Sequence, residues 1–257
     1  MSLRQSKSIH GGRMKNWQIM TTKELADYIK LNEKTVLKMA QQGHIPGIKI
    51  GNQWRFHPLV IDRYLQNQLM QSSDEELNSI IRTKENVIPI SRLTNEALID
   101  LDVRAKNKKQ ALSALADIAF QAGLTSSYEN LYAALKKREE MLSTAVGQGV
   151  AISHPRHPMD LLFSEPRIVI ARIPLGVHFD APDGQKVCLI FMPCAPTDFA
   201  HIRLIAKISK LLHVPGNIER LKDAQAKEEV MRILLAFDQR QILPVQDQSD
   251  TRSKKEK

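Results

Sequence analysis

The first regular pattern of apolar and polar positions predicts two short helices. Residues 21–24 (TTKE) have the form of a capping box, in which Thr21 accepts from the backbone and Glu24 reaches back. Apolar residues then recur at helical spacing. Asn32 is a favourable N-cap for a second helix, and Gly43 stands where the residue after a helix end belongs. We therefore expect two helices joined by a tight turn.

Two β-rich runs follow these helices, at residues 48–50 (IKI) and 53–56 (QWRF), with Gly51 and Asn52 between them. This arrangement predicts a β-hairpin, and Pro58 suits the first turn of a third helix. A helix-turn-helix followed by a two-stranded wing is a shape that reads DNA, because one α-helix fits the major groove.

Polar side chains on the second helix and on the wing are the candidates for DNA contacts. They are Lys34, Thr35 and Lys38 on the helix and Lys49 and Arg55 on the hairpin. Lysine and arginine neutralise phosphates, and polar groups early on the helix reach base edges. The alternative for each lysine is an ordinary solvated face. We expect Trp54 and Phe56 to fill the small core instead.

Three stretches of this region resemble the excisionase-type winged helix domain, which is related to the MerR regulators. They are residues 20–29 (MTTKELADYI), 32–36 (NEKTV) and 43–56 (GHIPGIKIGNQWRF). Lys30 departs from the family, which often has glycine in this turn. The resemblance therefore implies either a less comfortable backbone at Lys30 or a slightly different turn.

The rest of the chain alternates strands with helices. Strands are expected at residues 98–103, 150–152, 167–173 and 187–192. The last of these is apolar throughout, as a central strand buried on both faces should be. Helices are expected to open at Asn107, Ser126, Thr197 and Lys227. The alternation predicts an α/β domain with a mixed sheet flanked by helices, after a small, mainly α winged helix-turn-helix domain.

Changes in composition divide the chain into five parts. We expect a flexible arm at 1–16, a winged helix DNA-binding domain at 17–67, a linker at 68–90, an α/β domain at 91–240 and a disordered tail at 241–257. A short helix over residues 74–82 would fall inside the linker.

The composition narrows the class of protein. The chain has 257 residues, of which 42% are hydrophobic and 25% charged, in the ordinary globular range and unlike collagen, a disulfide scaffold or a disordered chain. The most apolar run, residues 187–192, is far shorter than the roughly 20 residues of a membrane span. Neither a secretory signal nor a CxxC pair is visible, so we expect a cytoplasmic protein with two reduced cysteines.

The positive charge is concentrated in the first quarter of the chain. The net charge is +9, and residues 1–70 hold 11 Lys and Arg against 4 Asp and Glu. Such asymmetry points to nucleic acid or another anionic surface as a partner.

Three polar residues of the α/β domain are candidates for chemistry. His154 follows a predicted central strand, where sheets of this class place reactive groups, and His201 opens an apolar helix. Arg138 precedes a glycine-containing loop, residues 143–149, whose backbone amides could approach an anion. A neutral imidazole is a nucleophile at pH 7, and an arginine offers planar donors to phosphoryl oxygens. These groups fit a phosphohistidine site, but each residue also has an ordinary structural interpretation.

A metal site is not expected. His157 lies three residues after His154, but no third ligand stands at a convincing spacing. No other cofactor is expected either.

Four stretches of this domain resemble the enzyme IIA domain of the fructose/mannitol class of the sugar phosphotransferase system, which includes the nitrogen-regulatory IIA proteins. They are residues 137–144 (KREEMLST), 147–154 (GQGVAISH), 179–196 (FDAPDGQKVCLIFMPCAP) and 201–212 (HIRLIAKISKLL). The resemblance implies that His154 accepts a phosphoryl group, assisted by His201 and Arg138. It implies the histidine phosphocarrier protein, or its nitrogen-branch counterpart, as the donor. Ser153 and Ala145 depart from the family, which usually has proline and often has glycine at these positions.

A DNA-binding domain joined to a phosphorylatable domain predicts a transcriptional regulator. The phosphorylation state of His154 would modulate DNA binding or oligomerisation, because a phosphate adds almost two negative charges. Two alternatives stay open: an enzyme IIA that passes phosphoryl groups toward a sugar permease, and a DNA-binding protein whose IIA-like domain is no longer phosphorylated. We expect a homodimer or several copies on DNA, because one short helix reads few bases.

Overall fold

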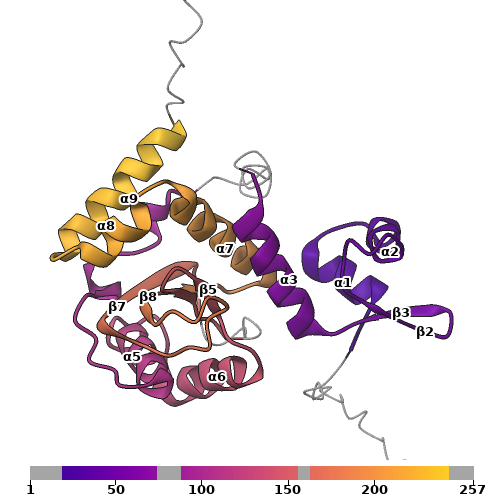
Figure 1. The fold of residues 1–257 in the computed structure, drawn as a ribbon, viewed down its shortest axis with the longest axis horizontal. Helices are drawn as coiled ribbons and strands as arrows, with labels where there is room; N and C mark the ends of the chain where they lie inside the picture. The colour runs from indigo at the N-terminus through magenta and orange to yellow at the C-terminus, as the bar shows by residue number, and fades with distance from the viewer. Residues whose placement is uncertain (1–18, 74–87, 156–162, 243–257) are drawn as a thin grey trace, which may run out of the picture. The chain divides into compact units, whose positions relative to one another are not determined.

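The computed structural model describes residues 19–73, 88–155 and 163–242 (Figure 1). The predicted arm at 1–16, the short helix at 74–82, His157 and the predicted tail beyond residue 242 lie outside these ranges. Contacts within the chain separate two units, residues 1–64 and residues 65–257, and each is described by itself.

The first unit is a helix-turn-helix with a wing. Its elements are β1 (Met20–Thr21), α1 (Thr22–Ile29), α2 (Glu33–Gln41), β2 (Ile48–Ile50), β3 (Gln53–Phe56) and the start of α3 (Pro58–Gln71). The sheet has the order β1-β3-β2 and is antiparallel throughout. The hairpin predicted around Gly51 is confirmed, and β1, which is only two residues long, adds a third strand that the sequence pattern did not indicate.

Local side-chain chemistry sets the ends of these helices. The backbone N–H of Thr21 donates to the Glu24 carboxylate at 2.7 Å, and the Glu24 N–H donates to the Thr21 hydroxyl at 3.2 Å, so the predicted capping box is present. The Asn32 side chain accepts from the N–H of Lys34 and caps α2. Lys30 ends α1 with φ of 56°, the left-handed conformation that glycine adopts more easily.

The core of the first unit is small and tightly packed. Leu25, Val36 and Phe56 are fully buried, whereas Trp54 is half-buried beside Phe56, with 6.4 Å between the ring centroids. The backbone of Gly47 lies directly against the Phe56 ring, where a Cβ would come within 2.7 Å of it. The prediction that the two aromatic residues serve the core therefore holds fully for Phe56 and partly for Trp54.

The second unit is an α/β domain with a five-stranded mixed sheet. The strands are β4 (Ile99–Asp100), β5 (Ala145–Gly147), β6 (Val150–Ile152), β7 (Arg167–Val177) and β8 (Val187–Cys194). Their order is β4-β7-β8-β6-β5, in which β4 is parallel to β7 and β6 to β8. The remaining pairs are antiparallel. The central position predicted for residues 187–192 is confirmed.

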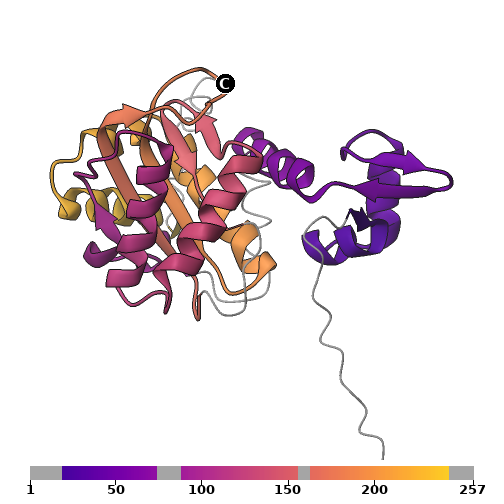
Figure 2. The same ribbon diagram turned by 90° about the horizontal axis from the view of Figure 1, so that it is seen from below.

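Helices cover both faces of this sheet (Figures 1 and 2). They are α5 (Lys108–Gln121), α6 (Tyr128–Met141), α7 (Asp198–His213), α8 (Asn217–Asp223) and α9 (Lys227–Ile242), and two short 3-10 helices, η1 (Ile90–Arg92) and η2 (Glu96–Leu98), precede β4. Successive residues of each strand alternate between the faces: Ile190 packs with α5 and α6, and Leu189 packs with α7, α8 and α9.

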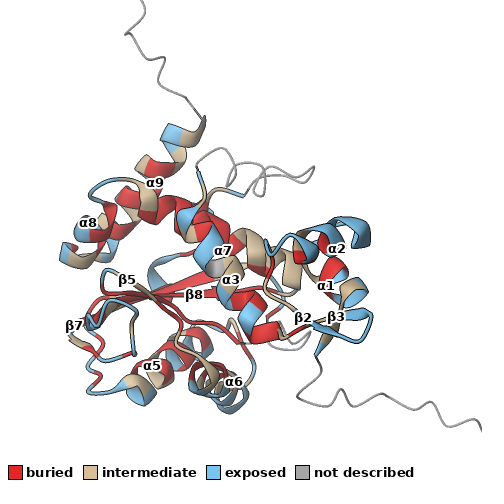
Figure 3. Ribbon diagram, turned by 45° about the vertical axis from the view of Figure 1, so that its right-hand side comes forward, coloured by how far each residue is buried: buried red, intermediate tan, exposed pale blue. Residues whose placement is uncertain are grey.

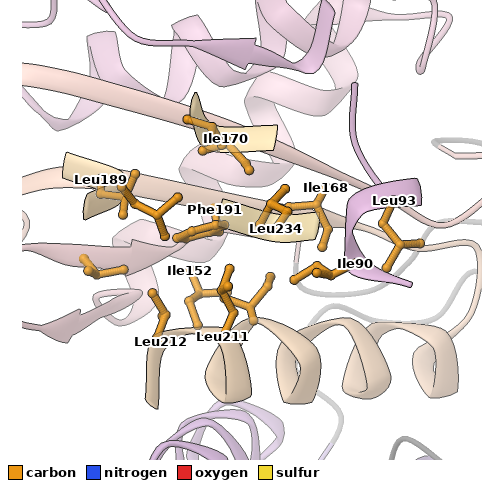
Figure 4. Packing of buried hydrophobic residues seen from close by; sticks show 14 of the residues in the cluster. Ile90, Leu93, Ile152, Ile168, Ile170, Leu189, Phe191, Leu211, Leu212 and Leu234 are labelled. Atoms are coloured by element: carbon orange, nitrogen blue, oxygen red, sulfur yellow. The ribbon is translucent and has the colours of Figure 1, made fainter. Parts of the chain in front are cut away.

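The sheet lies between two apolar layers and is almost wholly buried (Figure 3). Figure 4 shows Leu211 and Leu212 of α7 beneath Ile152 and Phe191 of the sheet. Both layers are continuous from one end of the sheet to the other, so the positions at which the strands end are firmly held.

Some predicted elements have different lengths. The strand predicted at 98–103 is reduced to β4, because residues 96–98 form η2, capped by the Asn95 side chain. The strands at 167–173 and 187–192 extend to Val177 and Cys194, and the last helix extends to Ile242. Neither α8 nor β5 was predicted, since both are short.

Candidate functional site

The fold brings His154 and His201 together at one edge of the sheet. His154 follows β6, and His201 lies in the first turn of α7, which follows β8. Because β6 and β8 are parallel, their carboxyl ends meet at the same edge. The two imidazole rings are buried, with centroids 4.4 Å apart.

The hydrogen bond of His154 defines its tautomer. Its Nδ1 lies 2.9 Å from the backbone carbonyl oxygen of Pro155. A carbonyl oxygen only accepts, so Nδ1 carries the proton and Nε2 carries the lone pair. Burial holds the pKa of His154 well below its ordinary value, and the neighbouring His201 and Arg138 lower it further. The ring is therefore a neutral imidazole whose Nε2 carries the lone pair.

Arg138 supplies the permanent positive charge of the site. It lies in the last turn of α6, and its side chain is fully buried. Its Nη1 donates to the carbonyl oxygen of Leu142 at 2.7 Å, which fixes the guanidinium at the end of the helix. The positive charge of Arg138 acts on His154 and lowers the pKa of its ring.

A buried polar network supports the backbone beside His154. The Glu139 carboxylate accepts from the N–H of Thr144 at 3.0 Å and from its hydroxyl at 2.6 Å. The Thr144 hydroxyl is 3.0 Å from that of Ser153, and the Ser153 N–H donates to the carbonyl oxygen of Phe191 at 2.9 Å. The network thus ties the end of α6 to the residue before His154.

The sequence reasoning missed this network. Glu139 stands in a run of charged residues and reads as a solvated side chain. The available signal was Ser153, noted only as a departure from the family.

The two glycines of the segment predicted to approach an anion, residues 143–149, lie away from His154. The segment contains β5, which forms a hairpin with β6, and its glycines lie at the turn, away from the end of β6 that leads to His154. The Gln148 N–H donates to the Asp183 carboxylate at 2.6 Å, so the anion that this turn binds is a side chain of the same chain.

The predicted DNA-contacting residues are placed on three surfaces. Lys34, Thr35 and Lys38 are exposed on α2. On the wing, Lys49 pairs with Trp54 and Arg55 pairs with Ile48, so Lys49 and Arg55 extend to opposite faces of the sheet. Contacts of these two side chains with DNA therefore stay predictions for two separate faces of the wing.

Arg55 lines a groove of about 290 Å³ between the start of α1, the helix α2 and the wing. Its guanidinium donates to the carbonyl oxygen of Trp54 and to the side chain of Gln53, which orients it within the wing. The groove also takes in Thr22, Lys23 and Asn52, polar residues that the sequence analysis did not select.

The described residues contain neither a metal cluster nor a membrane-spanning helix. No group of three or more His, Cys, Asp or Glu side chains suited to a metal ion occurs among them. None of the helices in residues 19–73, 88–155 and 163–242 is long and apolar enough to cross a bilayer.

The fold and the site define the class as a helix-turn-helix domain joined to an enzyme IIA-type α/β domain. Residues 19–69 match the model of the helix-turn-helix domain, and residues 92–236 match that of the phosphoenolpyruvate-dependent sugar phosphotransferase system, EIIA 2. The chain belongs to this EIIA 2 family. Both resemblances drawn from the sequence are thereby confirmed.

The curated relatives match the second unit. The chain is 30% identical to the fructose-specific EIIA component of the phosphotransferase system from Haloferax volcanii, over 58% of this chain and 96% of that protein. It is 33% identical to a nitrogen regulatory protein from Bradyrhizobium diazoefficiens, over 57% and 96% respectively.

Solved structures agree with this assignment. The nitrogen regulatory protein IIA-Ntr from Neisseria meningitidis superposes with a TM-score of 0.51 at 29% identity, covering 56% of this chain and 98% of that one. The IIA mannitol structure from Escherichia coli superposes with a TM-score of 0.50 at 23% identity, over 55% of this chain and 98% of that one, and shows the same fold.

Proposed function

We propose that this protein is a DNA-binding transcriptional regulator whose IIA domain accepts a phosphoryl group on His154. The observation that carries the proposal is the geometry of His154: a neutral ring with Nε2 as the nucleophile, beside His201 and Arg138, in the same chain as a helix-turn-helix domain. The proposed donor is a phosphohistidine of the histidine phosphocarrier protein.

The proposed transfer uses the phosphohistidine of the donor and the groups that the site holds. The lone pair of His154 Nε2 attacks phosphorus, a nitrogen–phosphorus bond forms, and the corresponding bond to the donor histidine breaks. Nδ1 keeps its proton and its hydrogen bond to the Pro155 carbonyl oxygen, and this bond stabilises the phosphorylated ring. Arg138 offsets the charge of the phosphoryl oxygens, and the His201 ring is close enough to donate to one of them. Because His154 is 1% exposed, transfer requires a local rearrangement that opens Nε2 to the donor.

The phosphoryl group would change the charge of the second unit by almost two units. We propose that this change alters DNA binding or association between copies of the chain, by favouring one of two arrangements. Several copies on DNA are expected, because α2 spans only nine residues and reads few bases.

The first test is phosphorylation in a defined mixture of phosphoenolpyruvate, enzyme I and the phosphocarrier. Intact mass should show an acid-labile phosphate on the wild-type chain and on His178→Ala, a matched control that removes an exposed histidine of the same domain. The His154→Ala variant should carry none. A phosphate that persists in His154→Ala would overturn the assignment of the acceptor.

The second test joins the two domains. Affinity for DNA should differ between the phosphorylated and unphosphorylated wild-type chain, whereas His154→Ala should bind DNA without responding to the phosphocarrier mixture. Lys38→Gln should weaken DNA binding and reduce its salt dependence by about one counterion. Equal DNA affinity in both phosphorylation states would refute regulation of DNA binding by His154.

A second candidate function is phosphotransfer toward a sugar permease. It is favoured by the similarity to a fructose-specific EIIA component. Adding a IIB partner to the phosphorylated chain distinguishes the two functions, since a transport component would pass its phosphoryl group on within the assay.

A further inference from the structure

A small cavity on one side of α7 combines apolar walls with two cationic side chains. Its volume is about 160 Å³. The walls include Ile88, Leu93, Pro166 and Leu204, and the cations are Arg203 and Lys207. Positions 203, 204 and 207 share one face of α7, so all three residues border this cavity. The Arg203 guanidinium also lies over the Phe199 ring, 5.6 Å from its centroid.

Lys207 is the unusual member of this group. Its side chain is only 7% exposed, and buried lysines are normally paired. Within residues 19–73, 88–155 and 163–242, no hydrogen bond or ion pair of Lys207 is present. Asp238 acts on it electrostatically, but the Asp238 carboxylate already accepts from the N–H groups of Ile90 and Ser91, each at 2.9 Å.

The neighbouring lysine on the same helix shows the contrast. Lys210 is 4% exposed, and its ammonium donates to the side chain of Gln241. Lys210 therefore has a protein partner, whereas the charge of Lys207, on a mostly buried side chain, borders the cavity without one among the described residues. Such a charge favours an anionic ligand, because leaving it uncompensated costs free energy.

We propose that this cavity binds a small organic carboxylate with a short apolar chain. The carboxylate pairs with Lys207 at the cationic end near Arg203, and the chain lies against Leu93, Leu204 and the other apolar walls. Pockets for drug-sized ligands have volumes of about 300 Å³ or more. This cavity is smaller, so it limits the ligand to a handful of carbon atoms. The site is separate from His154 and does not depend on the function proposed above.

The cavity and the histidine pair share helix α7. Arg203 lies two residues after His201 on α7, so a bound carboxylate would rest against the helix that carries His201. A small-molecule signal and the phosphorylation site would then share one structural element.

The test uses 4-methylpentanoate as the probe and its neutral amide, 4-methylpentanamide, as the matched ligand. Isothermal titration of the full chain should show saturable binding of the carboxylate and at least tenfold weaker binding of the amide. Lys207→Met, which keeps the length of the side chain and removes the charge, should lose at least tenfold in affinity. Lys210→Met is the matched control and should bind like the wild type, since Lys210 does not line the cavity.

A second readout, proton uptake on binding, can be measured on the wild type alone and then compared with Lys207→Met. Burial lowers the pKa of Lys207 to about 8, with Arg203 and Lys210 of α7 lowering it further and Asp238 of α9 opposing them. A carboxylate stabilises the ammonium form, so binding at pH 8 should take up about half a proton. The measured heat should therefore vary with the ionisation enthalpy of the buffer for the wild type and not for Lys207→Met.

Three results would overturn the proposal. The first is the absence of saturable binding up to about 10 mM, a concentration far above the Kd of typical specific sites. The second is equal affinity for the carboxylate and the amide. The third is binding that takes up no proton and that Lys207→Met leaves unchanged. Tighter binding of inorganic phosphate than of 4-methylpentanoate would overturn the assignment to a carboxylate.

Discussion

We expect the hydrogen bonds of the Glu139 carboxylate to be the main polar contacts that hold the backbone beside His154 in place. It is 4% exposed and accepts two hydrogen bonds from Thr144, while its second oxygen lies 3.2 Å from the ammonium of Lys108. The substitution Glu139→Gln keeps the size of the side chain and one acceptor oxygen but removes the charge. It therefore tests the charge of the carboxylate with little change in packing.

The expected loss is about 2 kcal/mol in the free energy of unfolding of the second unit. Hydrogen bonds to a charged acceptor contribute roughly 1.5–3 kcal/mol each and neutral ones about 1, so two weakened bonds account for this amount. Lys108 adds little to the loss, because it keeps the Asp180 carboxylate at 2.7 Å. Stranding a fully buried charge would cost more, about 3–5 kcal/mol.

Glu140→Gln is the matched control, since it makes the same chemical change one residue further along α6. The Glu140 side chain is 61% exposed and 3.8 Å from Lys136, and such surface pairs contribute at most about 0.5 kcal/mol. A difference between the two variants therefore reports burial and hydrogen bonding and not helix propensity.

Two optical probes separate the units during urea unfolding. Both tryptophans of the chain, Trp17 and Trp54, belong to residues 1–64, so tryptophan fluorescence follows the first unit. Far-ultraviolet circular dichroism is dominated by the helices of the second unit, and its midpoint should fall by about 1 M in Glu139→Gln. An unchanged circular dichroism midpoint, or an equal shift in fluorescence, would refute the role given to Glu139.

Three further predictions follow from single residues. Ser153→Pro should destabilise the second unit by about 1–3 kcal/mol, because the Ser153 N–H bonded to Phe191 is lost; a dichroism midpoint equal to that of the wild type would contradict this. Lys30→Gly should stabilise the first unit by about 0.5–1 kcal/mol, because φ at this position is 56°; a lower fluorescence midpoint would refute it. His154 has a folded pKa below its unfolded value of about 6.5, so protonation favours unfolding as pH falls through 6.5. Between pH 6.5 and 5.5 the wild type should therefore lose about 1 kcal/mol more stability than His154→Gln, and equal losses would show that the ring is not held neutral.

The first unit was predictable from sequence because its determinants are local. The capping box of Thr21 and Glu24, the cap at Asn32 and the turn at Gly51 each act within a few residues. Even the departure at Lys30 has a local outcome, a left-handed backbone at the end of α1. The two-residue strand β1 was missed because only its pairing with β3 defines it.

The arrangement of the α/β domain could be predicted only in part from local sequence patterns. Alternating strands and helices indicated its class, but which strands are neighbours depends on contacts between distant segments. His154 and His201 are brought together by the parallel pairing of β6 and β8, which no spacing in the sequence states. A family resemblance selected these two residues, and the pairing explains why they meet.

Buried charge was the feature that the sequence concealed most fully. Arg138 and Glu139 stand in a run of charged residues, and Lys207 is a lysine on an amphipathic helix. All three read as solvated, yet all three are buried. Whether a charged side chain on an amphipathic helix faces solvent depends on what packs against it. For this reason the network beside His154 and the cavity on α7 emerged only with the tertiary structure.

The two departures from the family's backbone pattern are compatible with an ordered site, and each for a different reason. Proline before an acceptor histidine restricts the backbone through its ring, whereas Ser153 is held by a hydrogen bond to Phe191 and by contact with the Thr144 hydroxyl. A glycine is required only where φ is positive or space is short, and Ala145 is not among the described residues with positive φ. Ala145 instead pairs with Ala151 in the β5–β6 hairpin, where a small buried side chain fits. The conformation of His154 is therefore maintained by hydrogen bonding in place of ring constraint, which makes the Glu139 network more important here than it would be beside a proline.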